Sequence, residues 1–147
     1  DLVAQARSTA LSQIDQTIQL DISGSDIDGR MVELARKNAE QAGVAEQIHF
    51  KQMRLQDLHT DKINGVIISN PPYGERLLDD EDVTRLYQEM GETFAPLKTW
   101  SKFILTSDAA FESKYGCQAA KQRKLYNGTF KVDLYQYFGQ RVKRQLD

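Results

Sequence analysis

The sequence predicts an α/β fold in which a mostly parallel sheet closes on an antiparallel hairpin. Apolar, β-branched runs alternate with helical segments along most of the chain, and an Asn-Gly pair at 127–128 separates the last two strand-like runs. Alternating strands and helices are typical of a parallel sheet with helices on both faces. Asn-Gly is the strongest short signal for a hairpin turn, because both turn residues must reach positive φ.

The bulk composition predicts one soluble domain. The chain has 147 residues, of which 40% are hydrophobic and 27% charged, and it contains no repeat or linker. No apolar run approaches the roughly 20 residues of a membrane helix. The single cysteine, Cys117, excludes an internal disulfide, and with only two histidines a metal site is not expected. This cysteine usage is typical of the reducing cytoplasm, where we expect the protein.

The first half of the chain is predicted to contain two helices and two strands. Apolar residues recur at helical spacing over 2–17, and a strand that ends at Gly24 is expected within 17–26. The next helix spans 29–42, with its apolar residues on one side and Gly43 as its C-terminal stop. The alternating segment 48–53 is typical of a short strand.

The second half adds two buried strands, two helices and the hairpin. Residues 64–69 form a β-branched run of the kind found in central parallel strands, and 101–107 is a second buried strand. A helix is expected over 81–95, where Pro96 closes it, and 108–116 is expected to be helical. The predicted order is therefore β-α-β-β-α-β-α, followed by the hairpin.

Polar or aromatic residues follow the carboxyl ends of three predicted strands. Asp26 follows the first strand, Asp57 the second, and the segment 69–73 the third. In open α/β sheets, ligands bind beyond the carboxyl ends of the strands. We therefore expect these residues to meet at one site.

The segment Asn70-Pro71-Pro72-Tyr73 is predicted to be a catalytic clamp for an amine. The two prolines fix φ and remove two N–H donors, which makes the loop rigid and rich in acceptors. The Asn70 amide oxygen, together with the carbonyl of Asn70 or Pro71, suits a substrate NH2 group. Tyr73 offers a flat face on which a base stacks, worth about 1–3 kcal/mol. The alternative is a rigid turn without chemistry.

Such a clamp suits the exocyclic amine of a planar group. The lone pair of this amine is delocalised into the ring, so the nitrogen is a poor nucleophile. Acceptors on both N–H groups favour a more tetrahedral nitrogen, whose lone pair then points at an electrophilic carbon held in line. No side-chain base is needed before attack, because the proton becomes acidic only after alkylation.

The electrophile is expected to be a methyl donor that carries an adenosine. Asp26 is placed where a carboxylate accepts from both ribose hydroxyls, Ile27 where it packs on the adenine, and Asp57 where it accepts from the adenine amine. Asn70 borders both the donor and the substrate. Two alternatives stay open, namely Asp26 as a helix cap, as Asp28 is expected to be, and Asp57 as an ordinary loop acid.

Four segments together resemble S-adenosylmethionine-dependent N-methyltransferases, namely GSDIDGRMVELARKNAEQAGV, QDL, ISNPPYGERL and LYNGTFKVDLYQYFG. The match looks like the bacterial 23S ribosomal RNA guanine-N2 methyltransferase family, whose members carry a THUMP RNA-binding domain ahead of the catalytic one. The resemblance covers roughly residues 2–140. It implies a Rossmann-like class I methyltransferase sheet, S-adenosylmethionine as cofactor and ribosomal RNA as partner. Asp26 would then hold the ribose, Asp57 or its neighbour the adenine, and Asn70, Pro71 and Tyr73 the target base.

The chain departs from the family pattern at its start. Members open with a strand and a glycine-rich loop of the type Asp-x-x-Cys-Gly-Ser-Gly-Thr, and nothing before Asp21 resembles that loop. We therefore expect residues 1–147 to be a partial catalytic domain, the C-terminal piece of a larger enzyme, that binds the donor weakly and is inactive alone. RNA would be held mainly by the absent N-terminal domain. The open sheet edge would expose apolar surface, which favours a homodimer.

Other functions share this clamp. Adenine N6 in DNA and the glutamine side chain of a release factor present the same kind of amine. A DNA enzyme usually carries a basic target-recognition region after the clamp, and only about 70 residues follow it here. Glutamine enzymes usually follow the tyrosine with an apolar residue rather than Gly-Glu-Arg. RNA guanine is the first choice, and a non-catalytic methyltransferase-like scaffold is the alternative from a different class.

The charge of the chain is uneven. Residues 1–113 carry 11 basic and 19 acidic side chains, whereas residues 114–147 carry 8 basic and 2 acidic ones. A basic end of this kind fits either a polyanion or a solvated tail. The net charge of -2 is too acidic for the chain to hold a large nucleic acid unaided.

Overall fold

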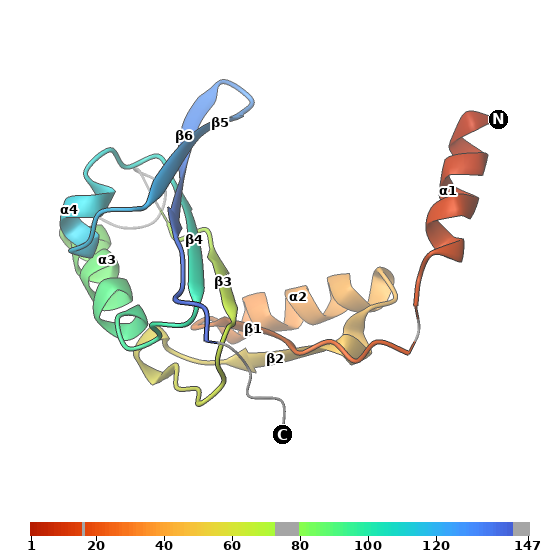
Figure 1. Ribbon diagram of the computed structural model, residues 1–147, viewed down its shortest axis with the longest axis horizontal. Coiled ribbons are helices and arrows are strands. Elements are labelled where there is room, and N and C mark those ends of the chain that lie inside the picture. Colours follow the sequence, from red (N-terminus) through yellow and green to blue (C-terminus); the bar gives the residue numbers. More distant parts are fainter. Residues whose placement is uncertain (16, 73–79, 143–147) are drawn as a thin grey trace. The chain divides into compact units, whose positions relative to one another are not determined.

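A computed structural model describes residues 1–15, 17–72 and 80–142 (Figure 1). The chain forms two compact units, Asp1–Arg54 and Leu55–Asp147. Within the described ranges, no helix has both the length and the apolar content that a membrane crossing requires.

The first unit contains a two-stranded parallel sheet with one helix packed on it. Its elements are α1 (Leu2–Ser12), β1 (Ile22–Asp26), α2 (Gly29–Gln41), the 3-10 turn η1 (Ala45–Gln47) and β2 (Ile48–Gln52). α2 packs on both strands and buries Val32 and Ala39. The strand expected within 17–26 starts only at Ile22 and ends at Asp26, two residues after the predicted end at Gly24. Its two ends pair with Ile48 and Gln52, the first and last residues of its parallel partner.

α1 is shorter than the predicted helix over 2–17, and all of its side chains are exposed. It ends at Ser12. Three residues later, Asp15 Oδ1 accepts hydrogen bonds from the backbone N–H and the hydroxyl of Thr17, at 2.8 and 2.6 Å. A local side-chain turn of this kind competes with helical hydrogen bonding, which accounts for the early end.

The second unit is a four-stranded sheet with two helices on one face. Its elements are η2 (Leu55–Asp57), β3 (Val66–Ser69), α3 (Asp80–Phe94), β4 (Ser101–Thr106), α4 (Phe111–Tyr115), β5 (Lys121–Asn127) and β6 (Phe130–Tyr137). The strand order is β3-β4-β6-β5. β3 runs parallel to β4, and β6 is antiparallel to both of its neighbours. The predicted α/β class with parallel strands and a closing hairpin is therefore confirmed.

The strands lie in two sheets rather than in the single sheet expected. Within the described residues, β1 pairs only with β2, and β3 pairs only with β4. β3 is consequently an edge strand of its sheet. Its Val66 and Ile68 side chains are 58% and 81% exposed, which agrees with the apolar surface expected at an open edge. The homodimer stays a prediction.

The hairpin turn lies one residue later than predicted. Asn127 is the last residue of β5 and pairs with Phe130, so the turn residues are Gly128 and Thr129. Of these two, only Gly128 has a positive φ, 63°. A glycine at the first turn position is typical of a type II′ turn, which needs positive φ at that residue alone.

Aromatic side chains fill the core between the helices and the sheet of the second unit. Tyr87, Ile104 and Phe111 are completely buried. The Phe111 ring meets Tyr87 edge-on at 4.9 Å and lies 4.8 Å from Tyr135. Aromatic pairs of this kind add about 0.5–1.5 kcal/mol each beyond burial alone. The core therefore fixes α3 against β4, whose carboxyl end lies beside that of β3.

Candidate functional site

The predicted amine clamp begins where β3 ends. Asn70 follows the last strand residue and is exposed, whereas the next residue, Pro71, is buried. Pro72 is exposed again. An amide held in solvent by a buried proline is a rigidly presented hydrogen-bonding group, because Pro71 has a fixed φ. Tyr73, the fourth predicted clamp residue, lies outside the described residues.

A buried tyrosine supports the clamp from the core of the second unit. Tyr87 on α3 is fully buried, and its hydroxyl lies 2.9 Å from Thr106 Oγ1 and 3.4 Å from the Pro72 carbonyl oxygen. A carbonyl only accepts, so the Tyr87 hydroxyl donates in its contact with Pro72, whereas either hydroxyl can donate in the contact between Tyr87 and Thr106. Thr106 Oγ1 in turn accepts from the Asp108 backbone N–H at 3.1 Å. We call this chain of four residues the clamp relay.

The clamp relay divides the acceptors of the loop into two groups. The Pro72 carbonyl points at the core, where Tyr87 takes it, although the 3.4 Å distance marks this as the weaker of the two contacts. The acceptors left for a substrate amine are the Asn70 amide oxygen and the carbonyls of Asn70 and Pro71. The relay therefore anchors the loop through the Pro72 carbonyl, and the part of Pro72 in the clamp stays a prediction.

The far end of the clamp relay is anchored by an ion pair. Asp108 Oδ2 lies 2.7 Å from Lys114 Nζ, and Asp108 Oδ1 accepts from the Ala110 N–H at 2.8 Å. Lys114 Nζ also lies 5.9 Å from the centre of the Tyr87 ring, within range of a cation–π interaction. The same lysine therefore contacts two members of the relay, Asp108 and Tyr87.

Sequence reasoning did not identify Tyr87 or Thr106 as site residues. Tyr87 occupies the apolar stripe of α3 together with Val83, Met90 and Phe94. A tyrosine at such a position buries a hydroxyl that needs a partner, and Thr106 is the polar residue that ends an apolar strand. These two signals identify each residue as a hydrogen-bonding group but do not identify the pairing between them.

The predicted donor site lies in the first unit, at the end of β1. Asp26 Oδ1 accepts from the Asp28 backbone N–H at 2.8 Å, which shapes the turn into α2. Asp28 is the N-cap of α2 and accepts from the Arg30 N–H at 2.9 Å. The alternative in which Asp26 caps this helix is therefore wrong, and the cap predicted for Asp28 is confirmed. Hydrogen bonds from Arg30 hold the pKa of Asp28 below its ordinary value.

The turn after Asp26 is fixed from β2. Gln52 Nε2 donates to the Ile27 carbonyl at 2.9 Å, and a Cβ on Gly29 would lie 2.8 Å from Gln52 Oε1. A side chain at that position would therefore displace the end of the Gln52 side chain from its present place. The Ile27 side chain projects outward and is 65% exposed.

Asp26 and Ile27 fit the adenosine part of a methyl donor in their chemistry. Only one carboxylate oxygen of Asp26 bonds within the turn, so the other remains to accept from ribose hydroxyls. The exposed Ile27 offers an apolar face for a purine ring. These residues therefore suit S-adenosylmethionine, as the sequence predicts.

Asp57 belongs to the second unit, where it ends the 3-10 turn η2 and is exposed. Leu55 and Leu58, on either side of it, pack against the aromatic core. These two contacts hold the turn in place while Asp57 faces solvent. The structure thus places Asp57 and Asn70 in one unit and Asp26 in the other, and the expected meeting of the three strand ends stays a prediction.

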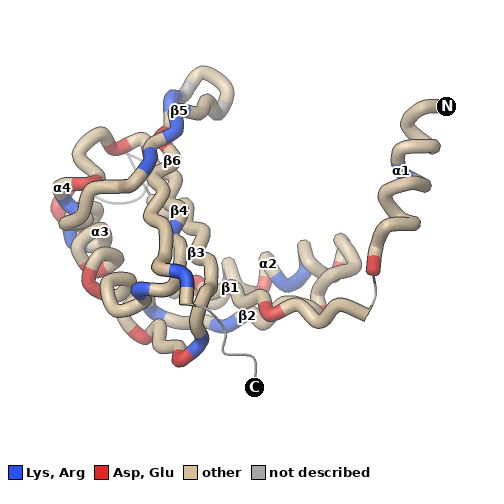
Figure 2. Tube along the Cα trace, viewed as in Figure 1, with Lys and Arg blue, Asp and Glu red and all other residues tan. Residues whose placement is uncertain are grey.

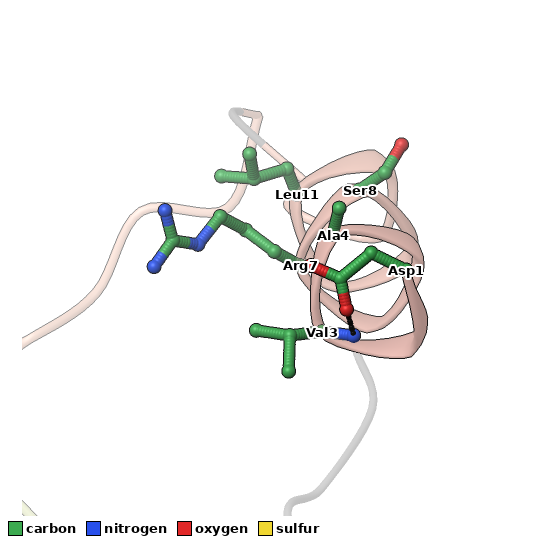
Figure 3. A pocket seen from close by; sticks show the side chains of 6 residues that line it. All are labelled: Asp1, Val3, Ala4, Arg7, Ser8 and Leu11. Atoms are coloured by element: carbon green, nitrogen blue, oxygen red, sulfur yellow. Dashed lines mark hydrogen bonds between the residues drawn. The ribbon is translucent and has the colours of Figure 1, made fainter.

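The first unit also has a hollow on its surface, and none of the predicted site residues lines it. It is lined only by α1 and its cap, Asp1, whose carboxylate accepts from the Val3 N–H at 3.1 Å (Figure 3). Arg7 and Leu11 complete one side of it. The surface of a single helix encloses no ligand, so we assign no function to this hollow.

Comparison with known proteins identifies a family. Residues 1–136 match the RMKL-like methyltransferase domain (UPF0020). The chain is 49% identical over 138 residues to YpsC of Bacillus subtilis (strain 168), which is named as a candidate RNA methyltransferase. It is 38% identical over 129 residues to ribosomal RNA large subunit methyltransferase K/L of Shewanella sp. (strain W3-18-1). These matches cover 94% and 87% of the chain but only 36% and 18% of the two relatives.

Solved structures share the fold. The crystal structure of SMU.472, a candidate methyltransferase complexed with SAH, matches with a TM-score of 0.90 and 68% identity, over 97% of this chain and 38% of that one. A structure from Listeria monocytogenes str. 4b F2365, named as a predicted N6-adenine-specific DNA methylase, matches with a TM-score of 0.83 and 45% identity, over 93% and 35%. The predicted methyltransferase resemblance and fold class are confirmed, and the THUMP domain remains untested.

Proposed function

The chain belongs to the RMKL-like methyltransferase domain family, and from this membership we propose that it serves in the S-adenosylmethionine-dependent methylation of an exocyclic amine. SAH, present in the SMU.472 complex, is the product that this cofactor leaves, and it supports the choice of donor. The K/L relative supports ribosomal RNA as substrate, with guanine N2 as our first choice and the cytoplasm as the place of action. Because the chain spans 36% of YpsC, the activity is proposed for the complete gene product.

The observation that carries this proposal is the presentation of Asn70. Its amide is exposed at the end of a strand, directly before a buried proline, and the clamp relay holds the loop from behind. The Asn70 amide oxygen accepts from one N–H of the target amine, and the carbonyl of Asn70 or Pro71 accepts from the other. These bonds favour a pyramidal nitrogen whose lone pair faces the donor. Such positioning stabilises the transition state more than the ground state.

The donor supplies an electrophilic methyl group when it is bound. Asp26 accepts from its ribose hydroxyls, and Ile27 packs on its adenine. Asp57 accepts from the adenine amine. None of these residues takes part in the transfer itself, and their role is to hold the donor in line with the amine.

A methyl-transfer assay tests the proposal. The complete gene product is incubated with tritium-labelled S-adenosylmethionine and unmodified 23S ribosomal RNA transcribed in vitro, and the RNA is digested to nucleosides. Labelled N2-methylguanosine supports the first choice. Label in another amino-methylated nucleoside keeps the clamp chemistry and overturns the guanine assignment. No transfer to RNA overturns the proposed substrate.

Adenine N6 in DNA is the second candidate, and the name of the Listeria structure favours it. The same assay with unmethylated genomic DNA separates the two, because labelled N6-methyladenine then appears in DNA and not in RNA. Absence of transfer to both substrates, with donor binding retained, favours a non-catalytic scaffold.

A further inference from the structure

The hairpin of β5 and β6 carries the densest positive charge of the described second unit (Figure 2). Its basic residues are Lys121, Arg123, Lys124 and Lys131, against a single acid, Asp133. That acid is 7% exposed and lies 3.7 Å from Lys131 Nζ, so the pair offers little charge to a partner. The other three basic side chains are exposed and remain available.

The register of the sheet shows how far this hairpin reaches. Thr106, the last residue of β4, pairs with Asp133, and β6 extends three residues further to its start at Phe130. At about 3.4 Å per residue, the hairpin projects roughly 10 Å past the end of β4 before its turn. Figure 1 shows this overhang.

The overhang lies at the same end of the sheet as the amine clamp, the end at which β3 and β4 finish. β3 and β4 are parallel, and Ser69 pairs with Ile104, two residues before the end of β4. The chain therefore leaves β3 toward Asn70 in the direction in which the hairpin projects. A nucleic-acid strand that offers a base to Asn70 passes within a few nucleotides of the overhang.

An exposed aromatic side chain lies on the overhang among these charges. Tyr126 is 73% exposed and pairs across the hairpin with Lys131. Residues of a strand alternate between its faces, so Lys124 and Tyr126 share one face and Arg123 the other. Cations beside an exposed aromatic ring form the pattern by which proteins hold single-stranded nucleic acid, with phosphates on the cations and a base on the ring.

We propose that the β5–β6 hairpin holds the RNA strand next to the target base. Arg123 and Lys124, which lie level with the last two residues of β4, contact phosphates, and Tyr126 on the overhang stacks on a flanking base. This inference rests on the proposed function, because it takes RNA as the substrate. The basic end of the chain is then a substrate-binding device and not a solvated tail. Residues 1–113 carry a net charge of -8, so the electrostatic attraction of RNA is directed to the basic hairpin.

Matched charge variants of the complete gene product test the cationic part. Arg123→Ala/Lys124→Ala removes two charges from the hairpin. Lys98→Ala/Arg141→Ala removes two exposed charges near the amino end of β4, where the Lys98 carbonyl accepts from the Gln140 N–H. Binding of unmodified 23S ribosomal RNA is measured by filter retention over a range of salt. The plot of log affinity against log salt has a negative slope, and the hairpin variant is expected to reduce its magnitude by about 1.4, at about 0.7 per phosphate contact. The control variant keeps the slope.

Two variants of Tyr126 test the stacking part. Tyr126→Ala is expected to raise KM for the RNA by roughly 5- to 150-fold, the range that corresponds to the loss of one base stack. The value of kcat at saturating RNA stays unchanged. Tyr126→Phe keeps the ring and is expected to keep KM, because the hydroxyl takes no part. An equal rise of KM in both variants overturns the stacking assignment.

A crosslink gives a readout that does not depend on turnover. A photoreactive phenylalanine analogue placed at position Tyr126 is expected to crosslink to the RNA, and the same analogue at position Lys98 is not. Equal crosslinking, or equal salt slopes in the two charge variants, overturns the inference even when the wild-type protein methylates RNA. Failure of the wild-type protein to methylate RNA overturns the proposed function instead, and the binding and crosslinking results still decide the role of the hairpin.

Discussion

Replacing Tyr87 by phenylalanine removes one buried oxygen and leaves the ring in the aromatic core. The variant loses the 2.9 Å hydrogen bond with Thr106 and the longer contact with the Pro72 carbonyl. Thr106 keeps the Asp108 N–H as a donor, so only its own proton is stranded. A buried hydrogen bond contributes about 1 kcal/mol, and a stranded buried group costs up to about 3 kcal/mol. We therefore expect the free energy of unfolding to fall by about 1–2 kcal/mol in urea titrations.

The effect on catalysis separates support of the clamp from stability alone. Without the anchor on Pro72, the acceptors at Asn70 and Pro71 are held less precisely in space. We expect kcat to fall about tenfold, equivalent to about 1.4 kcal/mol of transition-state stabilisation. We expect donor affinity to stay unchanged, because Asp26 and Ile27, which we assign to the adenosine of the donor, are not members of the relay.

Tyr137→Phe is the matched control. The Tyr137 hydroxyl is also buried and donates to the Cys117 carbonyl at 3.0 Å, but Tyr137 pairs with Lys102, near the start of β4. This variant is expected to lose similar stability and to keep kcat. Equal kcat values for the two variants would refute the role of Tyr87 in the clamp. Thr106→Val combined with Tyr87→Phe should lose less than the sum of the single effects, since both belong to one hydrogen-bonded chain.

Four further predictions concern Asn70, Asp26, Tyr115 and Ile68. Asn70→Ala should abolish methyl transfer and leave donor affinity nearly unchanged, as tritium transfer and calorimetry will report. Asp26→Ala should weaken donor binding by about 1–3 kcal/mol, because it strands the ribose hydroxyls. Burial raises the pKa of Tyr115 to about 12, so its contribution to stability is complete below about pH 10 and is lost by about pH 12, at about 1.4 kcal/mol per pH unit in urea unfolding. Ile68→Thr should reduce self-association in sedimentation equilibrium, because it removes the most exposed apolar side chain of the β3 edge.

Each of these predictions has an outcome that contradicts it. Near-normal turnover in Asn70→Ala excludes that amide from the reaction. An unchanged cofactor titration in Asp26→Ala removes the ribose assignment. For Tyr115, the phenylalanine variant should lessen the alkaline loss and leave the part due to Tyr135 and Tyr137, whose pKa values burial also raises. An equal loss in that variant contradicts the contribution of Tyr115. A protein that sediments as a monomer before any substitution removes the homodimer.

Local signals in the sequence were sufficient for most elements of the fold. α2 was predicted over 29–42 and observed over Gly29–Gln41, because its apolar spacing, its Asp28 cap and its Gly43 stop all lie within the segment itself. The hairpin was predicted from Asn127-Gly128 for the same reason. The start of β1 was not predictable, because it depends on where the parallel partner begins to pair.

The clamp residues could be recognised in the sequence because they are contiguous. The residues that support the clamp could not be recognised. Tyr87 and Thr106 are 19 residues apart, on a helix and a strand that only the packed core brings together. No periodicity in the sequence specifies which buried hydroxyl meets which. The role of the Pro72 carbonyl as an anchor, which the carbonyls of Asn70 and Pro71 do not share, likewise depends on a single long-range hydrogen bond.

The two prolines give a reason why the clamp needs such a relay. A strand end is ordinarily tied down by its backbone N–H groups, but Pro71 and Pro72 have none. Only the carbonyls of the two prolines are left as anchors, and the proposed clamp uses the carbonyl of Asn70 or Pro71 for the substrate amine. A buried donor that takes the last carbonyl fixes the loop at no cost to the acceptors ahead of it. Tyr87 is placed to do this, since its ring is locked by Phe111 and its hydroxyl is oriented by Thr106.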